Sequence, residues 1–319
     1  MSLRVGVIGA GLMGSTHVRL LSASVSGAEV VAVSDAVQES ARRLAGEVGV
    51  DTVYTDARDL IEDPGVDAVI IASPAETHEP FVLACFEAGK PVLCEKPLAA
   101  TPAAARHVLD AEAALERPLV QVGFMRRFDP AYLELKAKLD SGAIGRPLLA
   151  HCAHRNATVP PRFDSEMILR DSTVHDIDTA RWLLGQEIVK ATVLTPRPSR
   201  HAPEGVHDPL LVIFQTDAGG LIDVEAFVNA QYGYDIRCEV VGETGTAALP
   251  PHAAANFQER FAAAYVGELE AWIASIAGGE PAGARAWDGY AAALVCEAAV
   301  ESLRTGEPVE VAIEQGVTP

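Results

Sequence analysis

The sequence lacks any long hydrophobic run, and it has few aromatic residues and few positive charges for its 319 residues. Without about 18 consecutive apolar residues, we expect no membrane-spanning helix. The formal net charge of −19 repels phosphate backbones and anionic lipids, so we expect neither a nucleic acid nor a membrane as a partner. A β-like run begins almost at the first residue, which leaves no room for the charged leader and apolar core of a secretion signal.

Cysteine is also scarce, and its placement argues against a disulfide framework. The five cysteines are odd in number, lie far apart in the sequence and form no C-x-x-C motif. This usage is typical of reduced, buried thiols, and we therefore expect a cytoplasmic protein.

The first 123 residues alternate short β-branched runs with longer amphipathic stretches. The expected strands are residues 4–8, 30–34, 68–72, 91–94 and 119–123. The expected helices are residues 14–22, 38–47, 79–88 and 101–115. Thr101 and Pro102 mark the start of the last helix as its cap and its first helical residue. Apolar strands that alternate with helices predict an α/β fold with a doubly wound parallel sheet, covered on both faces.

After residue 123 the alternation of strands and helices ends, and turn signals separate a series of strand-like runs. The expected elements are helices at 131–139 and 171–184, strands at 210–216, 220–229 and 235–241, and helices at 258–276 and 287–304. We predict an α+β unit with an open, mainly antiparallel sheet. Residues 1–123 then form a cofactor-binding domain, and residues 124–319 form a domain for substrate binding and oligomerisation.

The sharpest motif is Gly9-Ala10-Gly11-Leu12-Met13-Gly14, which follows a strand and opens a helix. In this setting the first glycine permits a tight turn, the second lets the backbone approach a pyrophosphate, and the third allows the helix to pack closely on the strand. The helix N-terminus then offers unpaired N–H groups to the phosphates. The motif predicts a dinucleotide-binding Rossmann domain.

Asp35 ends the second expected strand, where a carboxylate accepts hydrogen bonds from the adenosine ribose and repels a 2′-phosphate. The residues Ala36-Val37-Gln38 follow it, with no arginine to hold such a phosphate. This arrangement predicts NAD as the cofactor in preference to NADP. The alternative is a glycine-rich turn with a capping aspartate.

Lys96 lies in Glu95-Lys96-Pro97, at the carboxyl end of an expected strand, where ligands of such sheets bind. A lysine at this place can donate a hydrogen bond to a substrate hydroxyl and stabilise the alkoxide that develops as hydride leaves. The alternative is a solvated surface lysine.

A second cluster begins at Asp171, and a helical spacing of four and then three residues places Asp171, His175 and Asp178 on one face. A histidine flanked by carboxylates is a good proton acceptor, because its imidazolium form is stabilised. The alternative is that these residues form a helix N-terminus, where the helix macrodipole stabilises acidic side chains.

A metal site at His151, Cys152 and His154 is a further alternative. On a strand, His151 and His154 point to opposite faces and cannot bind one ion without a bulge, whereas Cys152, His154 and Asn156 share a face. We expect no metal.

The glycine motif, Glu95-Lys96-Pro97 and the Asp171 to His175 segment together resemble the Gfo/Idh/MocA oxidoreductases over residues 4–311. Three further segments, residues 123–129, 151–156 and 232–236, are similar to the inositol dehydrogenases within this family. Between Leu249 and Phe261 the chain departs from the family pattern, because this stretch is short and rich in alanine.

The resemblance implies that the protein oxidises myo-inositol to its 2-keto form by hydride transfer to NAD, and that it forms a homotetramer through its C-terminal sheet. It implies that His175 removes the hydroxyl proton, that Asp171 orients His175, and that Lys96 steadies the oxygen. Proton removal by Lys96 itself remains an alternative. The substrate-binding positions it implies are Arg126, His154, Asn156, Asp178 and Tyr234. The expected cofactor-binding positions are Gly9, Gly11, Leu12, Met13, Gly14, Asp35, Ser73, Pro74, His78, Glu95 and Lys96.

Two other functions stay open at this point. The first is a related dehydrogenase activity whose substrate is scyllo-inositol or a pyranose such as glucose, which presents a similar ring of hydroxyls. A dinucleotide-sensing protein without activity predicts a broken catalytic set, whereas Lys96, Asp171 and His175 are all present.

Overall fold

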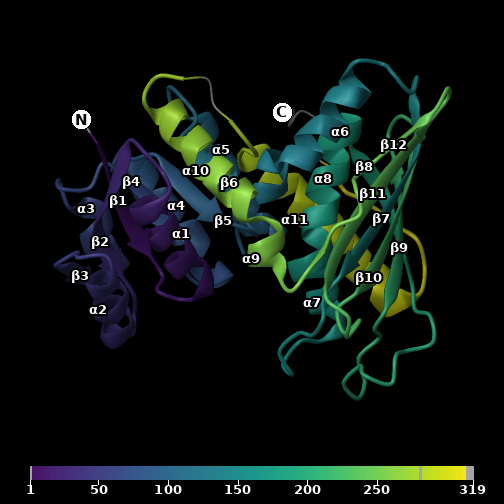
Figure 1. Ribbon diagram of the computed structural model, residues 1–319, viewed down its shortest axis with the longest axis horizontal. Coiled ribbons are helices and arrows are strands. Elements are labelled where there is room, and N and C mark those ends of the chain that lie inside the picture. Colours follow the sequence, from purple (N-terminus) through teal and green to yellow (C-terminus); the bar gives the residue numbers. More distant parts are fainter. Residues whose placement is uncertain (1, 280–281, 314–319) are drawn as a thin grey trace. The chain divides into compact units, whose positions relative to one another are not determined.

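The computed structural model describes residues 2–279 and 282–313, and the contacts divide the chain into two compact units (Figure 1). The first unit contains the residues up to Met125 together with Ala263–Tyr290. The second unit contains Arg126–Ala262 and the residues from Ala291 onward.

The first unit contains six parallel strands in the order β3-β2-β1-β4-β5-β6, which is the order of a Rossmann sheet. The strands are β1 (Leu3–Ile8), β2 (Ala28–Ser34), β3 (Thr52–Tyr54), β4 (Ala68–Ile71), β5 (Val92–Glu95) and β6 (Val120–Gly123). The predicted doubly wound sheet is confirmed. The sequence analysis missed β3, because three residues are too few to show a period.

Helices connect these strands, coloured purple to blue in Figure 1. They are α1 (Leu12–Ala23), α2 (Gln38–Glu47), α3 (Ala57–Glu62), the 3₁₀ turn Ala75–Thr77, α4 (His78–Glu87) and α5 (Pro102–Ala113). Thr101 caps α5 as predicted, and its hydroxyl accepts a hydrogen bond from the Ala104 N–H at 3.2 Å. The short helix α3 is a second element that the sequence analysis missed.

Helix α10 (Ala262–Ile276) belongs to the core of the first unit, although it lies far along the chain. Its residues Leu269, Trp272 and Ile273 are buried in one cluster with Val5 and Val18 from β1 and α1. A single cut after residue 123 therefore does not describe how the chain packs, because the apolar face of this helix is buried on the N-terminal sheet.

The second unit is built on a mixed sheet of eight strands in the order β12-β11-β7-β10-β9-β8-β14, with β13 paired to β11. The strands are β7 (Pro147–Arg155), β8 (Ile188–Leu194), β9 (Leu210–Thr216), β10 (Leu221–Phe227), β11 (Tyr234–Gly242), β12 (Thr246–Ala248), β13 (Ala253–Ala254) and β14 (Val309–Glu310). The predicted, mainly antiparallel sheet is confirmed.

The expected strands 220–229 and 235–241 follow one another in the sequence but do not pair, because β7 lies between β10 and β11 and pairs with β10 in parallel. The sequence analysis gave β7 and β8 no place in the sheet. A long connection brings β7 to the centre, and no local pattern reports such a crossover.

The helices of this unit differ from the prediction in two ways. They are the 3₁₀ turn Met125–Phe128, α6 (Pro130–Asp140), α7 (Ser165–Met167), α8 (Val174–Leu184), α9 (Phe257–Arg260) and α11 (Ala286–Thr305). A π-helical turn, Ile168–Thr173, precedes α8, so the predicted helix over 171–184 is α-helical only from Val174. The predicted helix over 258–276 is divided between α9 and α10.

Trp272→Ala tests whether α10 is part of the first unit's core. Because Trp272 is almost fully buried, we expect the substitution to lower the free energy of unfolding by about 3–5 kcal/mol. Chemical denaturation followed by circular dichroism measures this change. Glu270→Ala, at an exposed position of the same helix, is the control and should change the stability by less than about 0.5 kcal/mol. Equal stability of the two variants would contradict this packing.

Candidate functional site

The glycine motif forms the turn between β1 and α1, and two of its glycines are required by the backbone itself. Gly9 has a φ of +101°, and a Cβ there would lie 2.5 Å from the carbonyl oxygen of Ala72. A Cβ on Gly14 would lie 1.8 Å from the carbonyl oxygen of Gly9. No side chain is tolerated at either position, because β1, β4 and α1 approach one another too closely.

Gly11 is different, because a Cβ there would meet nothing within 4 Å. Packing therefore does not explain this glycine, whereas the approach of a ligand to the backbone does. Gly11 is also the N-cap of α1 and supplies no capping side chain, and the first turn of the helix contains no acidic residue. Leu12 is exposed and Met13 half-buried at this turn. The N–H groups of the turn suit a phosphate.

The carboxylate of Asp35 supports the same turn from the end of β2. Its Oδ2 accepts a hydrogen bond from the Ala10 N–H at 2.7 Å, and its Oδ1 accepts one from the Val37 N–H at 2.8 Å. Each oxygen has a further lone pair, and the side chain is partly exposed. Asp35 therefore fits the ribose-binding role while it also fixes the glycine turn.

The remaining cofactor-binding candidates follow β4 and β5. Ser73 hydrogen-bonds the Thr77 hydroxyl at 2.7 Å, and Pro74 opens the 3₁₀ turn before α4. The buried His78 places Nδ1 2.7 Å from the Pro97 carbonyl oxygen and Nε2 2.9 Å from that of Ser73. These contacts connect the two segments that follow β4 and β5.

Glu95 and Lys96 stand at the end of β5 in different surroundings. Glu95 is buried, and its Oε1 lies 2.7 Å from Nε2 of His17 on α1. Lys96 is half-buried, and the bond from Lys96 to Pro97 is a cis peptide. The sequence analysis gave His17 no role, because only the fold brings α1 and β5 together.

In the second unit, Asp171 and His175 lie on either side of the change from π-helix to α-helix. Asp171 is exposed in the π-helical turn, whereas His175 is buried in the first turn of α8. A spacing of four residues across a π-helical turn does not follow the α-helical period on which the prediction of one shared face rested. Asp178, further along α8, is fully buried.

Beside His175 lies a buried network that joins Arg126, His154 and Asp176. Arg126 donates from Nη1 to Asp176 Oδ1 at 2.6 Å, and His154 Nδ1 lies 2.8 Å from Asp176 Oδ2. The rings of His154 and His175 are 6.4 Å apart between centroids. Nη2 of Arg126 also lies 3.1 Å from Nδ1 of His154, so this ring nitrogen is held between a guanidinium and a carboxylate.

The charges of this network set the protonation of Asp176. Burial by itself raises the pKa of Asp176, but the nearby Arg126 and His154 outweigh burial and hold the pKa below its ordinary value. Asp176 therefore remains a carboxylate at neutral pH. The sequence analysis missed this residue, whose only signal was that it directly follows His175.

The other substrate-binding candidates are also held firmly. Arg127 donates two hydrogen bonds to Asp178, at 2.6 and 3.0 Å. Tyr234 packs edge-on to the ring of His154, with centroids 5.8 Å apart, and burial raises the pKa of its phenol. Asn156, just after β7, keeps a buried Oδ1 without a hydrogen-bond partner in the described part of the chain. The sequence analysis did not assign Arg127 to Asp178.

His151 and His154 point to opposite faces of β7, as the strand period predicts. His151 contacts Asp223 on the open face of the sheet, whereas His154 is buried with Asp176. Among the described residues, no three histidine, cysteine, aspartate or glutamate side chains form a cluster able to hold a metal ion. No helix within 2–279 or 282–313 has the length and apolarity needed to cross a membrane.

Comparison with known proteins assigns these features to a family. The profile described as oxidoreductase family, NAD-binding Rossmann fold, matches residues 3–124, and that of the GFO/IDH/MocA C-terminal domain matches residues 132–248. The chain belongs to the GFO/IDH/MocA oxidoreductase family. Its first unit is thus an NAD-binding Rossmann domain, as the glycine motif and Asp35 predict.

Members of this family resemble the chain along its whole length. Inositol 2-dehydrogenase 2 of Saccharopolyspora erythraea is 52% identical, with 98% of this chain and 97% of the relative covered. The structure of myo-inositol dehydrogenase from Lactobacillus casei with NAD(H) and myo-inositol has a TM-score of 0.95 at 38% identity, covering 100% and 99% of the two chains. The scyllo-inositol dehydrogenase of the same organism, with NAD(H) and scyllo-inositol, has a TM-score of 0.90 at 26% identity, covering 98% and 100%.

Asp35→Ser should relax the discrimination against NADP, because it removes the carboxylate that we expect to face the ribose. We expect the ratio of kcat/KM for NADP to that for NAD to rise about tenfold or more, equivalent to about 1.4 kcal/mol. Steady-state kinetics with both cofactors measures the ratio. Asp35→Asn removes the charge but keeps an oxygen for the glycine turn, and it should relax the preference with a smaller loss of NAD binding. A ratio unchanged in both variants would refute the ribose role.

Proposed function

We propose that the protein is an NAD-dependent inositol 2-dehydrogenase that oxidises myo-inositol to its 2-keto form. The observation that carries this proposal is the likeness, over the full chain, to a myo-inositol dehydrogenase whose structure contains both NAD(H) and myo-inositol. The 52% identity to a relative named inositol 2-dehydrogenase supports the same activity. Lys96, Asp171 and His175 are retained as the chemistry requires.

We propose a division of labour in which residues 1–123 bind the cofactor and residues 124–319 bind the substrate and carry the assembly. The glycine turn and Asp35 support the first assignment, and the buried network around His154 supports the second. Helix α10 is the exception in this division, because it stabilises the cofactor-binding unit.

In the proposed reaction His175 removes the proton of the reacting hydroxyl. Asp171 favours the imidazolium that forms, and Lys96 donates a hydrogen bond to the oxygen as negative charge develops on it. When bound, NAD supplies the acceptor for the hydride that leaves the carbon of the same C–O group. The alternative proton acceptor is Lys96, in which case His175 orients the hydroxyl.

We propose that Arg126, His154, Asn156, Asp178 and Tyr234 determine how the other hydroxyls are held. Arg126 and Asp178 are both buried in ion pairs, so their contribution comes through the side chains that they fix. Arg126 acts on His154, and Asp178 acts on Arg127. A site that hydrogen-bonds each hydroxyl strongly rejects an analogue that lacks one, because buried polar groups are then left unpaired.

Kinetics with three substrates tests the activity and the role of His175. We expect NAD reduction with myo-inositol to have a higher kcat/KM than with scyllo-inositol or glucose. His175→Ala should lower kcat by roughly 10²–10⁴-fold, the usual contribution of a positioned base. His201→Ala, at an exposed position, is the matched control and should keep full activity. No NAD reduction with any cyclitol would overturn the assignment, and a loss of only a few-fold in His175→Ala would make Lys96 the proton acceptor.

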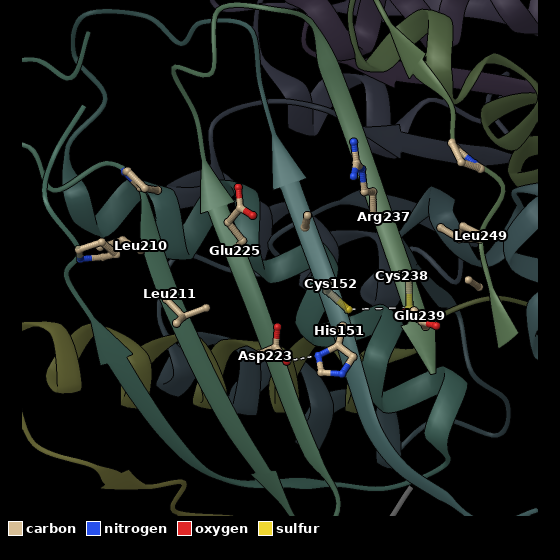
Figure 2. Close-up of a pocket in the computed structure, with 15 residues that line it drawn as sticks. His151, Cys152, Leu210, Leu211, Asp223, Glu225, Arg237, Cys238, Glu239 and Leu249 are labelled. Carbon is tan, nitrogen blue, oxygen red and sulfur yellow. Dashed lines mark hydrogen bonds and ion pairs between the residues drawn. The ribbon is translucent and has the colours of Figure 1, made fainter. Parts of the chain in front are cut away.

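We also propose that the protein forms a homotetramer through the open face of its second sheet. Figure 2 shows this face, where side chains of both charges stand on neighbouring strands. His151 and Asp223 are 2.5 Å apart, and Glu225 and Arg237 follow in the next row of side chains. A hollow of about 660 Å³ lies among these residues, with Leu210, Leu211 and Leu249 on its walls. Mixed charges around an apolar surface suit a self-complementary contact between two copies.

The double substitution Leu211→Asp and Arg237→Glu should dissociate this assembly. It places negative charge on an already acidic face, so that two copies repel each other. Light scattering coupled to gel filtration should then give a smaller mass than for the unmodified protein. Glu270→Lys, at an exposed position of α10, is the control and should leave the mass unchanged. A tetramer that persists in the double variant would refute this interface.

A cytoplasmic location is also proposed. All five cysteines are buried and free, and Sγ of Cys152 lies 3.8 Å from Sγ of Cys238 without a disulfide between them. Neighbouring thiols that remain reduced suit a reducing compartment.

A further inference from the structure

Lys96 lies between two residues that are each held by a buried histidine from a different helix. On one side, His17 of α1 contacts the carboxylate of Glu95. On the other side, His78 of α4 contacts the carbonyl oxygen of Pro97. Both imidazoles are at most 1% exposed. Neither role follows from the cofactor-binding motif.

The contact between His17 and Glu95 has one defined geometry. Glu95 pairs in the sheet with Gly123, and a Cβ on Gly123 would lie only 3.1 Å from both Cα and Oε2 of Glu95. The ring of His17 packs edge-on to Tyr265 at 6.2 Å. Its Nδ1 is buried and has no hydrogen-bond partner in the described chain, so the proton belongs on Nε2, which donates to Glu95 at 2.7 Å.

His78 anchors Pro97, on the other side of Lys96, through its ring nitrogen Nδ1. Nδ1 lies 2.7 Å from the oxygen of Pro97, and Nε2 lies 2.9 Å from that of Ser73. A carbonyl oxygen only accepts, so His78 holds the Pro97 carbonyl in the tautomer that carries its proton on Nδ1, whereas the tautomer with the proton on Nε2 donates to Ser73 instead. Leu98, the next residue, is fully buried and lies so close to Gly289 that a Cβ there would come within 2.6 Å of it. The segment around Lys96 therefore has little freedom.

We propose that His17 and His78 are positioning residues that hold the backbone of Lys96 in place for the reaction. This inference rests on the proposed role of Lys96. A catalytic group displaced by about 1 Å loses up to about 10²-fold in rate, so two rigid anchors on the neighbouring residues have a measurable effect. The anchors act on kcat through Lys96 and do not contact the substrate themselves.

Substitutions at His78 separate its two hydrogen bonds. An asparagine amide nitrogen takes the place of Nδ1, and a glutamine amide nitrogen takes the place of Nε2. We expect His78→Asn to keep kcat within about threefold, because the bond to Pro97 is retained, whereas His78→Gln loses about 10–100-fold. At His17, whose donor is Nε2, the order reverses: His17→Gln keeps most activity, whereas His17→Asn and His17→Leu each lose about 10–100-fold. A merely structural role predicts no such opposite preference at the two positions.

Combination with Lys96→Ala distinguishes this inference from the proposed function. If the histidines act through Lys96, His17→Leu and His78→Gln cause less than about a threefold further loss of kcat in the Lys96→Ala background. Circular dichroism and NAD binding by fluorescence identify the variants that fold. An equal loss in both backgrounds, or the same activity for asparagine and glutamine at position 78, would overturn the positioning roles. Wild-type activity of Lys96→Ala alone would instead refute the proposed role of Lys96, and no NAD reduction by the unmodified protein with any cyclitol would refute the proposed function.

Discussion

A buried histidine that hydrogen-bonds a buried carboxylate lies beside two of the proposed catalytic groups, Lys96 and His175. Glu95, held by His17, directly precedes Lys96, and Asp176, held by His154, directly follows His175. A buried carboxylate is tolerated only where its hydrogen bonds are satisfied, so it accepts few positions. In each unit, a buried carboxylate that accepts few positions thus fixes the backbone next to a reactive side chain.

The sequence predicts best those features whose cause is local. The turn at Gly9 and Gly14 is dictated by backbone contacts within a few residues and the adjoining strand, and Thr101 marks its helix directly. The place of β7 in its sheet was not predictable, because the pairing with β10 spans a long connection. The π-helical turn before α8 was also missed, since the residue pattern of Ile168–Thr173 does not differ from that of an α-helix.

The same distinction between local and non-local causes applies to the residues of the candidate site. Sequence motifs identified Lys96 and His175, because their residue types indicate the chemistry that they carry out. His17, Arg127 and Asp176 carry no such signal, because their function depends on partners that only the fold supplies, as when Arg127 reaches Asp178. Residues that support a reactive group can therefore be identified from the structure but not from the sequence pattern. The period of β7 was informative in one respect, since it separates the exposed His151 from the buried His154.

The proposed discrimination among ring isomers depends on this rigidity. The isomers of a cyclitol have the same hydroxyls and differ only in the direction in which each one points, so a flexible pocket accepts them all. Asp176 and Arg126 fix the orientation of His154, and Arg126 keeps Asp176 ionised. Removing one member of such a buried pair leaves an uncompensated charge, which costs about 3–5 kcal/mol. In the proposed site, the ion pairs of Arg126 and Arg127 provide the physical basis for distinguishing hydroxyl directions, because they deny the neighbouring side chains a second arrangement.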